Sequence, residues 1–293
     1  MTRDEFLKEK YSEFAKNYLQ SLGIREFYAN PSIARIDPFK IADNLYYVGD
    51  KKVCIHLIDT GEGLILLDSG YIGAQHLLVD SIWRAGFDPK NLRLIIHSHE
   101  HTDHFGASEE LRNMYGAKLA ISRVGANVLK EKDISTPSFP YAKAPSFDYE
   151  IEDGEIIELG NTKIRCILTP GHAEGVMSFF FEVTCDGKSY LAGMFGGAGV
   201  NAIKLPNMHH NGTPTDAPYK MLESIDKIYN EPVEIHLGNH PGNNKTLEKR
   251  QKQLTEGTNP FISKDSWHEF LDGLRETVKK IIAENEEMEK MFE

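Results

Sequence analysis

The stretch LRLIIHSHEHTDH, residues 92–104, decides how this chain is organised. Its first five residues are mainly aliphatic and predict a short buried strand. The strand leads directly into residues 99–104, where three imidazoles and the carboxylate of Asp103 stand within six positions. So many ligand-type side chains directly after a buried strand indicate a metal site on the loop beyond it.

Around this stretch the chain runs twice through a similar order of elements. In the first half, short strands with glycine-rich turns are expected between residues 45 and 68, followed by helix 72–86, strand 92–96, helix 106–115 and strand 118–121. In the second half we expect strands at 155–159, 163–169, 177–184 and 188–194, then helix 217–229, strand 233–237 and helix from there to the end. Two such halves would pack sheet on sheet with helices outside, which predicts an α/β fold of the four-layer αββα sandwich class.

Three further segments lie outside this pattern. Residues 3–22 predict a helix that ends at Gly23, within an N-terminal helical extension of residues 1–36. Residues 133–149 and 195–216 predict long surface loops, and long loops in compact domains are often functional.

Composition excludes several classes of partner. The 293 residues include 33 Lys and Arg against 44 Asp and Glu, a net charge of -11, which argues against a nucleic-acid surface and a polybasic membrane patch. No apolar run is long enough for a transmembrane helix. The three cysteines form no CxxC pair, and residues 1–23 are charged throughout. We therefore expect a cytoplasmic protein with a small-molecule substrate; the sequence leaves the oligomeric state open.

The ligand types indicate the class of metal. Neutral imidazole nitrogens and a carboxylate oxygen suit a borderline cation such as zinc. His99 and His101 lie two positions apart in extended chain and can converge on one metal, while Asp103 and His104 can turn toward a second. Catalysis requires an open coordination position, so three protein ligands per metal are expected, and two contributors remain to be found.

The two further candidates are His172 and His240, because each follows an apolar strand and stands beside a Pro-Gly pair. His210 is a candidate pocket residue in the predicted loop 195–216. His97 precedes the cluster on the strand and is expected to lie behind the ligands or in the core. The remaining histidines outside the cluster are not expected to be ligands.

At these residues the chain resembles the metallo-β-lactamase superfamily. Three motifs match in order, and they are Leu66-Leu67-Asp68-Ser69-Gly70, His99-x-His101-x-Asp103-His104 and Thr169-Pro170-Gly171-His172. Within the superfamily it is most similar to the third subclass of metallo-β-lactamases and their relatives, which take a last ligand from a His-Pro-Gly context, as at His240. The resemblance implies that residues 37–293 form the catalytic domain, which ends in an amphipathic helix.

The resemblance also implies roles for single residues. It places His99, His101 and His172 on one zinc, and it uses Asp68 to orient a ligand. On the second zinc it places three residues, which are Asp103, His104 and His240. Met194 stands where many relatives have a bridging Asp; it is a poor ligand for zinc and is expected to lie behind the ligands or to line the pocket. The lactamases of this subclass place serines near residues 194–196 to hold the carboxylate of the drug, and Met194 and Gly196 cannot replace them.

The implied function is a dinuclear zinc hydrolase, with two Zn²⁺ per chain, or Fe or Mn in their place. Two metals sharing a water would supply hydroxide to a carbonyl substrate, a cyclic amide, lactone, ester or thioester, with Asp103 orienting the hydroxide. A true β-lactamase is the narrower alternative. An iron-dependent oxidoreductase of the same fold is an alternative of another class, which His101 disfavours, since diiron relatives carry Glu at that position.

Overall fold

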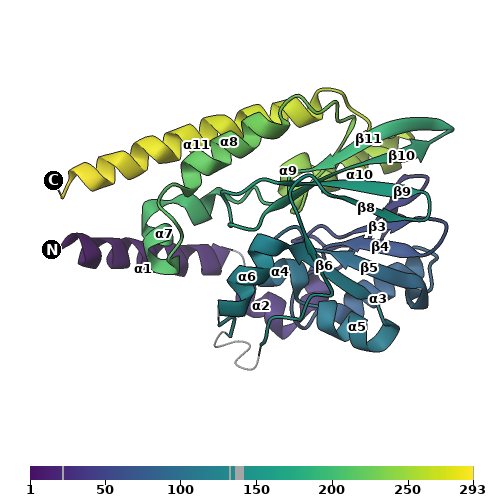
Figure 1. The fold of residues 1–293 in the computed structure, drawn as a ribbon, viewed down its shortest axis with the longest axis horizontal. Helices are drawn as coiled ribbons and strands as arrows, with labels where there is room; N and C mark the ends of the chain where they lie inside the picture. The colour runs from purple at the N-terminus through teal and green to yellow at the C-terminus, as the bar shows by residue number, and fades with distance from the viewer. Residues whose placement is uncertain (22, 132, 136–141, 293) are drawn as a thin grey trace.

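The computed structural model describes residues 1–21, 23–131, 133–135 and 142–292, and its strands form two sheets (Figure 1). The first sheet has seven strands in chain order, antiparallel from β1 to β4 and parallel from β4 to β7. They are β1 (Phe39–Ala42), β2 (Leu45–Tyr47), β3 (His56–Asp59), β4 (Leu64–Leu67), β5 (Leu92–Ile96), β6 (Lys118–Ser122) and β7 (Tyr149–Ile151).

The second sheet has five strands in the order β12-β11-β10-β9-β8. Strands β8 to β11 form an antiparallel meander, and β12 adds in parallel to β11. Their bounds are β8 (Ile156–Leu159), β9 (Thr162–Leu168), β10 (Met177–Cys185), β11 (Lys188–Met194) and β12 (Ile235–Leu237). Each sheet therefore combines a meander with parallel strands at one side, as the two-half pattern of the sequence predicts.

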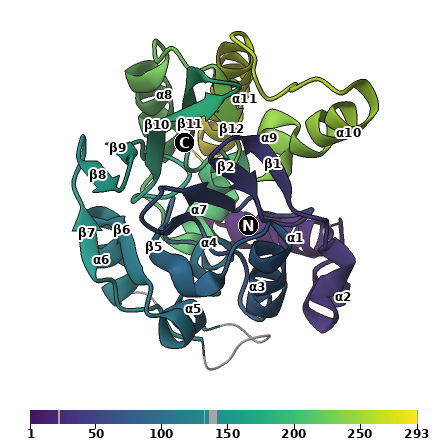
Figure 2. The same ribbon diagram turned by 90° about the vertical axis from the view of Figure 1, so that its right-hand side faces the viewer.

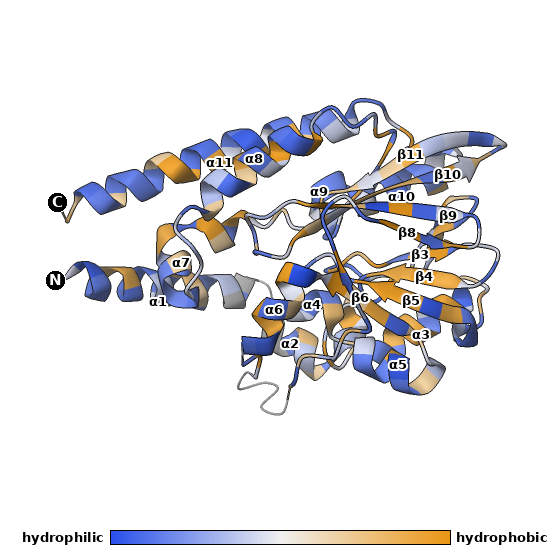
Figure 3. Cartoon of the chain, in the orientation of Figure 1, coloured by the Kyte–Doolittle hydropathy of each residue, from blue (hydrophilic) through white to orange (hydrophobic). Residues whose placement is uncertain are grey.

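The two sheets face one another, and helices cover both outer faces (Figure 2). Alternate side chains of both sheets share the central core, for example Leu67 and Ile96 from one sheet and Phe179 from the other. The outer face of the first sheet packs on α3 (Gln75–Arg84) and α5 (Ser108–Tyr115). The outer face of the second packs on α8 (Ala217–Ile228) and α11 (Ser266–Lys290). The predicted αββα sandwich is confirmed, and the hydropathy colouring shows apolar strands between mainly polar outer helices (Figure 3).

The structure corrects several predicted boundaries. The expected loop 195–216 contains the 3₁₀ turn η3 (Val200–Ile203) and α7 (Leu205–Asn211), which starts with a proline at its second position. Helix α6 (Arg123–Glu131) was not predicted, and it occupies residues that the sequence reasoning left unassigned. The expected helix 106–115 corresponds to α5, which begins at Ser108, and a separate short helix, α4 (Thr102–Phe105), precedes it. Residues 136–141 of the expected loop 133–149 lie outside the described residues.

The C-terminal region is helical with one interruption. After β12 the chain forms α9 (Pro241–Asn244), α10 (Thr246–Glu256) and then α11. Between the last two, Phe261 is fully buried in the central core and separates α10 from α11. Short 3₁₀ turns complete the described elements, η1 (Pro31–Ala34) and η2 (Pro89–Asn91). None of the helices in the described part of the chain is long and apolar enough to span a membrane.

The N-terminal extension packs against the second half of the chain. Helix α1 (Arg3–Ser21) lies along α7, and both α1 and the end of α11 project beyond the sheets (Figure 1). Arg3 Nε donates to Glu289 Oε2 at 2.6 Å, which ties the two projecting helices together. Helix α2 (Ile24–Ala29) then turns back toward the first sheet. Leu22, predicted as the last residue of the first helix, lies outside the described residues.

A buried histidine on β3 makes stability depend on pH. His56 is 1% exposed, and neither ring nitrogen has a hydrogen-bond partner among the described residues. Burial lowers its pKa from 6.5 to about 4. Below pH 6.5 the His56 imidazole therefore takes up a proton in the unfolded chain but stays neutral in the folded chain. The folded state loses stability as the pH falls from 6.5 toward 4.

We expect His56→Phe to remove this penalty. We would measure the free energy of unfolding of the metal-free proteins in urea. The difference between variant and wild type should change by about 2 kcal/mol in favour of the variant from pH 7 to pH 5. His76→Phe, on the exposed face of α3, is the matched control and should show no such gain. An equal difference between variant and wild type at both pH values would contradict the assignment.

Candidate metal centre

The candidate ligands come together where strand ends of both sheets meet. The loop and short helix after β5 carry His99, His101, Asp103 and His104, while His172 lies in the turn between β9 and β10. His240 follows β12. Backbone hydrogen bonds hold these loops across the sheets: Met177 N donates to Ser98 O at 2.7 Å, and Cys54 N, between β2 and β3, donates to Asn239 O at 3.0 Å.

The first triad consists of His99, His101 and His172. The Nδ1 atom of His101 lies 3.1 Å from His99 Nε2 and 3.0 Å from His172 Nε2. The three rings stand nearly edge to face, with interplanar angles between 79° and 88°. Three ring nitrogens therefore point at one common position.

The second triad consists of Asp103, His104 and His240. One carboxylate oxygen, Asp103 Oδ2, lies 3.5 Å from His104 Nε2 and 3.6 Å from His240 Nε2. His104 is buried, whereas the side chains of Asp103 and His240 are 24% and 36% exposed. The rings of His99 and His104 have centroids 4.1 Å apart, so the two triads are adjacent.

Hydrogen bonds on the far side of four imidazoles fix which nitrogen faces the triads. His99 Nδ1 lies 2.9 Å from Gly196 O, and His172 Nδ1 lies 2.6 Å from Gly199 O. In the second triad, His240 Nδ1 lies 2.7 Å from Lys52 O, and His104 Nδ1 lies 2.7 Å from Asp68 Oδ2. Each acceptor requires a proton on Nδ1 and leaves the Nε2 lone pair for a cation, as orienting partners of metal-binding histidines do.

Burial keeps most of these imidazoles neutral. It lowers the pKa of His172 to about 4 and lowers those of His99 and His240. His104 differs, because Asp103 and Asp68 outweigh its burial and raise its pKa. Burial also opposes ionisation of Asp103, but the neighbouring histidines outweigh it and hold the pKa of Asp103 at about 2. The triads therefore offer mainly neutral nitrogens and one carboxylate, the ligand forms that zinc requires.

One buried atom of the second triad indicates a missing binding partner. His104 Nε2 has no hydrogen-bond partner among the described residues. A buried polar atom without a partner costs about 1–3 kcal/mol, so its presence requires an explanation. A cation beside Asp103 Oδ2 would satisfy it. The donor sets, three nitrogens in one triad and two nitrogens with one oxygen in the other, fit zinc.

The remaining predicted residues have other surroundings. Asp68 is fully buried and accepts hydrogen bonds from the N–H and hydroxyl of Ser98 besides its bond to His104. Met194 lies in the core between the sheets and lines neither triad, so the prediction that it lines the pocket is wrong. His210 is exposed and stacks on Tyr11 of α1 with a centroid distance of 3.6 Å, which also corrects the prediction that it lines the pocket. His210 lies on α7 and contacts the N-terminal helix α1.

Three tyrosines near the second triad were missed by the sequence reasoning. Burial raises the pKa of Tyr18, Tyr28 and Tyr71, and in each the charge of Asp103 raises it further. Tyr71 stands edge-on to Tyr28 at 6.3 Å between ring centroids. They come from α1, α2 and the β4–α3 loop, and no spacing in the sequence relates them. What they share is the effect of the Asp103 charge on their pKa.

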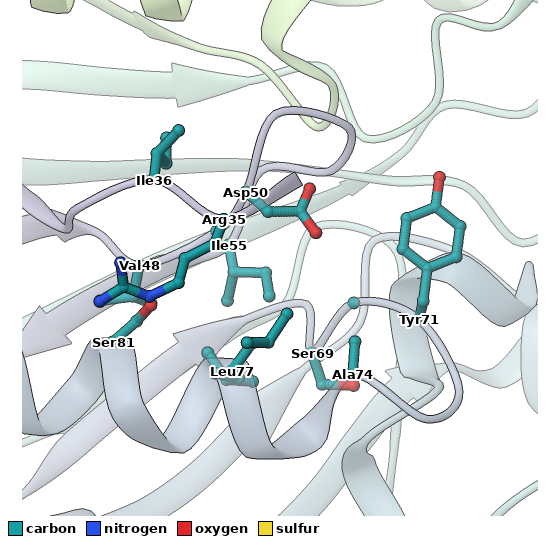
Figure 4. A pocket seen from close by; sticks show the side chains of 13 residues that line it. Arg35, Ile36, Val48, Asp50, Ile55, Ser69, Tyr71, Ala74, Leu77 and Ser81 are labelled. Carbon is teal, nitrogen blue, oxygen red and sulfur yellow. The ribbon is translucent and has the colours of Figure 1, made fainter. Parts of the chain in front are cut away.

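A small cavity lies beside this region. Tyr71 and Arg35 stand at its opposite ends, and Asp50 and Ser69 line it between them (Figure 4). Its volume of about 20 Å³ accommodates one water and no substrate. The side chains of Asp103 and His240 are 24% and 36% exposed, so a substrate can reach the second triad from solvent on their side.

Comparisons of the sequence with known proteins identify metal-dependent relatives. The model of the Metallo-beta-lactamase superfamily matches residues 49–184. Hydroxyacylglutathione hydrolase of Chelativorans sp. is 27% identical over 107 residues, which are 36% of this chain and 35% of that protein. A probable polyketide biosynthesis zinc-dependent hydrolase of Bacillus subtilis is 27% identical over 151 residues, 52% of this chain and 56% of that protein. The chain thus matches between about a third and just over half of the length of these curated relatives.

Solved structures give longer matches. A metallo-β-lactamase from Legionella gormanii aligns with a TM-score of 0.77 and 27% identity, covering 86% of this chain and 98% of that one. A subclass B3 metallo-β-lactamase of Bradyrhizobium japonicum aligns with a TM-score of 0.77 and 25% identity, covering 86% and 96%. The resemblance inferred from the sequence, including its third subclass, is confirmed.

Asp68→Asn should test the orienting bond to His104. The backbone of Asp68 has φ 64°, a conformation that Asn tolerates well, so the fold should persist. Its amide would present a donor where His104 Nδ1 needs an acceptor. We expect zinc affinity at the second triad to fall about 10–100-fold, measured by competition with a chromophoric chelator.

Asp59→Asn, at the end of β3, provides a matched control. It makes the same chemical change at a partly exposed carboxylate that accepts from Gly61 N, away from the ligands. Unchanged zinc binding in Asp68→Asn would show that Asp68 does not orient His104.

Proposed function

We propose that this chain, which matches the metallo-β-lactamase superfamily over residues 49–184, is a zinc-dependent hydrolase that binds one zinc ion at each triad and acts on a small carbonyl substrate. The observation that carries the proposal is the pair of adjacent three-ligand groups. Each provides three protein donors, and three-ligand zinc sites are catalytic because a coordination position stays open.

The chemistry divides between the metal and the chain. Bound zinc would supply a Lewis acid toward a carbonyl oxygen and lower the pKa of water to about 7. Asp103 is ionised at neutral pH and is partly exposed, so its carboxylate can accept a hydrogen bond from the attacking water and orient it. Tyr18, Tyr28 and Tyr71 would form the wall beside Asp103 and exclude bulk water from the substrate. In this proposal the N-terminal extension, residues 1–36, is part of the active site.

The substrate class is a lactone, ester, thioester or cyclic amide. The relatives named as hydrolases of hydroxyacylglutathione and in polyketide biosynthesis support acyl transfer to water. A β-lactam is disfavoured by the segment after β11. A side chain at Gly196 would place its Cβ 2.0 Å from Met177 O, and Met194 is buried, so neither position can offer a serine hydroxyl to a drug carboxylate.

Metal removal and ligand substitution test the proposed centre. Purified protein should contain close to two zinc ions per chain, and His101→Ala should weaken metal binding and abolish turnover. His76→Ala, on the exposed face of α3, is the matched control and should retain both. Hydrolysis by metal-free protein would contradict the proposal, and an iron chromophore in the purified protein would favour the oxidoreductase alternative.

A substrate panel tests the acyl class. With zinc present, we expect turnover of at least one lactone or thioester and a kcat/KM at least about tenfold lower for a chromogenic β-lactam, a difference of about 1.4 kcal/mol in transition-state binding. A β-lactam as the best substrate of the panel would overturn the assignment of substrate class.

A further inference from the structure

Glu100 is a buried carboxyl group that the proposed mechanism does not use. It stands between the ligands His99 and His101 and is 6% exposed. Its Oε2 atom has no hydrogen-bond partner among the described residues. A buried carboxyl in the middle of a ligand motif is costly to desolvate, so a structural reason for its presence is required.

The other oxygen reaches the loop that carries His172. Gly175 N donates to Glu100 Oε1 at 3.0 Å. Two residues further along, Met177 N donates to Ser98 O at 2.7 Å. The segment 98–100 is thus bound twice to the segment 175–177, once through its backbone and once through the Glu100 side chain. These bonds join the loop of His99 and His101 to the turn of His172.

Close packing holds the same turn from its other side. A Cβ built on Gly175 would lie 2.4 Å from Gly125 Cα and 2.7 Å from Glu100 Oε2. Ser122 Oγ donates to Gly175 O at 2.6 Å and accepts from Gly125 N at 3.0 Å. The start of α6 therefore presses Gly175 against Glu100, and the turn has little freedom to move away from the first triad.

We infer that Glu100 is a positioning residue that fixes His172 against His99 and His101 by accepting the Gly175 N–H bond, and so sets the affinity of the first triad for zinc. The inference rests on the proposed metal centre. The proposed role depends on the length of the Glu100 side chain, because only a side chain of this length extends from the ligand loop to Gly175. The negative charge of Glu100 has no part in it.

Two conservative variants separate reach from charge. Glu100→Asp keeps the charge but shortens the side chain by one methylene, which breaks the bond to Gly175. Glu100→Gln loses the charge but keeps an oxygen at the same reach. Both are measured in a His240→Ala background, which leaves the first triad complete and isolates its zinc affinity. We expect Glu100→Asp to weaken that affinity about 10–100-fold and Glu100→Gln to remain close to the background protein.

Glu174→Gln is the control, since it removes an exposed carboxylate next to Gly175 and should leave zinc affinity unchanged. Thermal unfolding of the metal-free variants checks that each is folded. Full affinity in Glu100→Asp, or equal weakening in both variants, would overturn the inference. Loss of zinc binding in the His240→Ala background itself would instead overturn the proposed metal centre.

Discussion

Ser98 holds the two sheets together at the point where both triads form. Its backbone oxygen accepts from Met177 N of the second sheet, and its N–H and hydroxyl donate to the buried Asp68 of the first. Asp68 in turn accepts from His104. One residue between the strand and the ligands thus fixes the spacing of the sheets, the orientation of a ligand and the start of the ligand loop. The position of each triad follows from these bonds.

The sequence predicted the candidate ligands because they occur in three segments that each follow an apolar strand. The strand ends of both sheets meet at one edge of the sandwich, so His99, His172 and His240 converge although they lie far apart in the chain. The layers were predictable for the same reason, since alternation and apolar runs report which faces are buried. Local residue type and strand order together carry this information.

Other features depend on tertiary contacts that no local pattern contains. The charge of Asp103 raises the pKa of Tyr18, Tyr28 and Tyr71, which come from three separate segments. In the sequence, Glu100 occupies a position between two candidate ligands to which the motif assigns no function. The hydrogen bond from Gly175 N to its side chain is visible only in the structure. Met194 matched the position of a relative's metal ligand, yet its apolar side chain enters the core. A residue aligned to a site by motif can therefore face away from it.

Each triad takes ligands from both halves of the chain, with His172 completing the first and His240 the second. A bound ion would therefore act as a cross-link between two half-domains that otherwise meet through their sheets. A ligand that binds only the assembled state increases its free energy of unfolding by RT ln(1 + [L]/Kd), where [L] is the free ligand concentration. Packing of the two halves against each other and binding of the metal are then thermodynamically coupled. In a cell, the supply of zinc would regulate how long this protein stays folded as well as how fast it works.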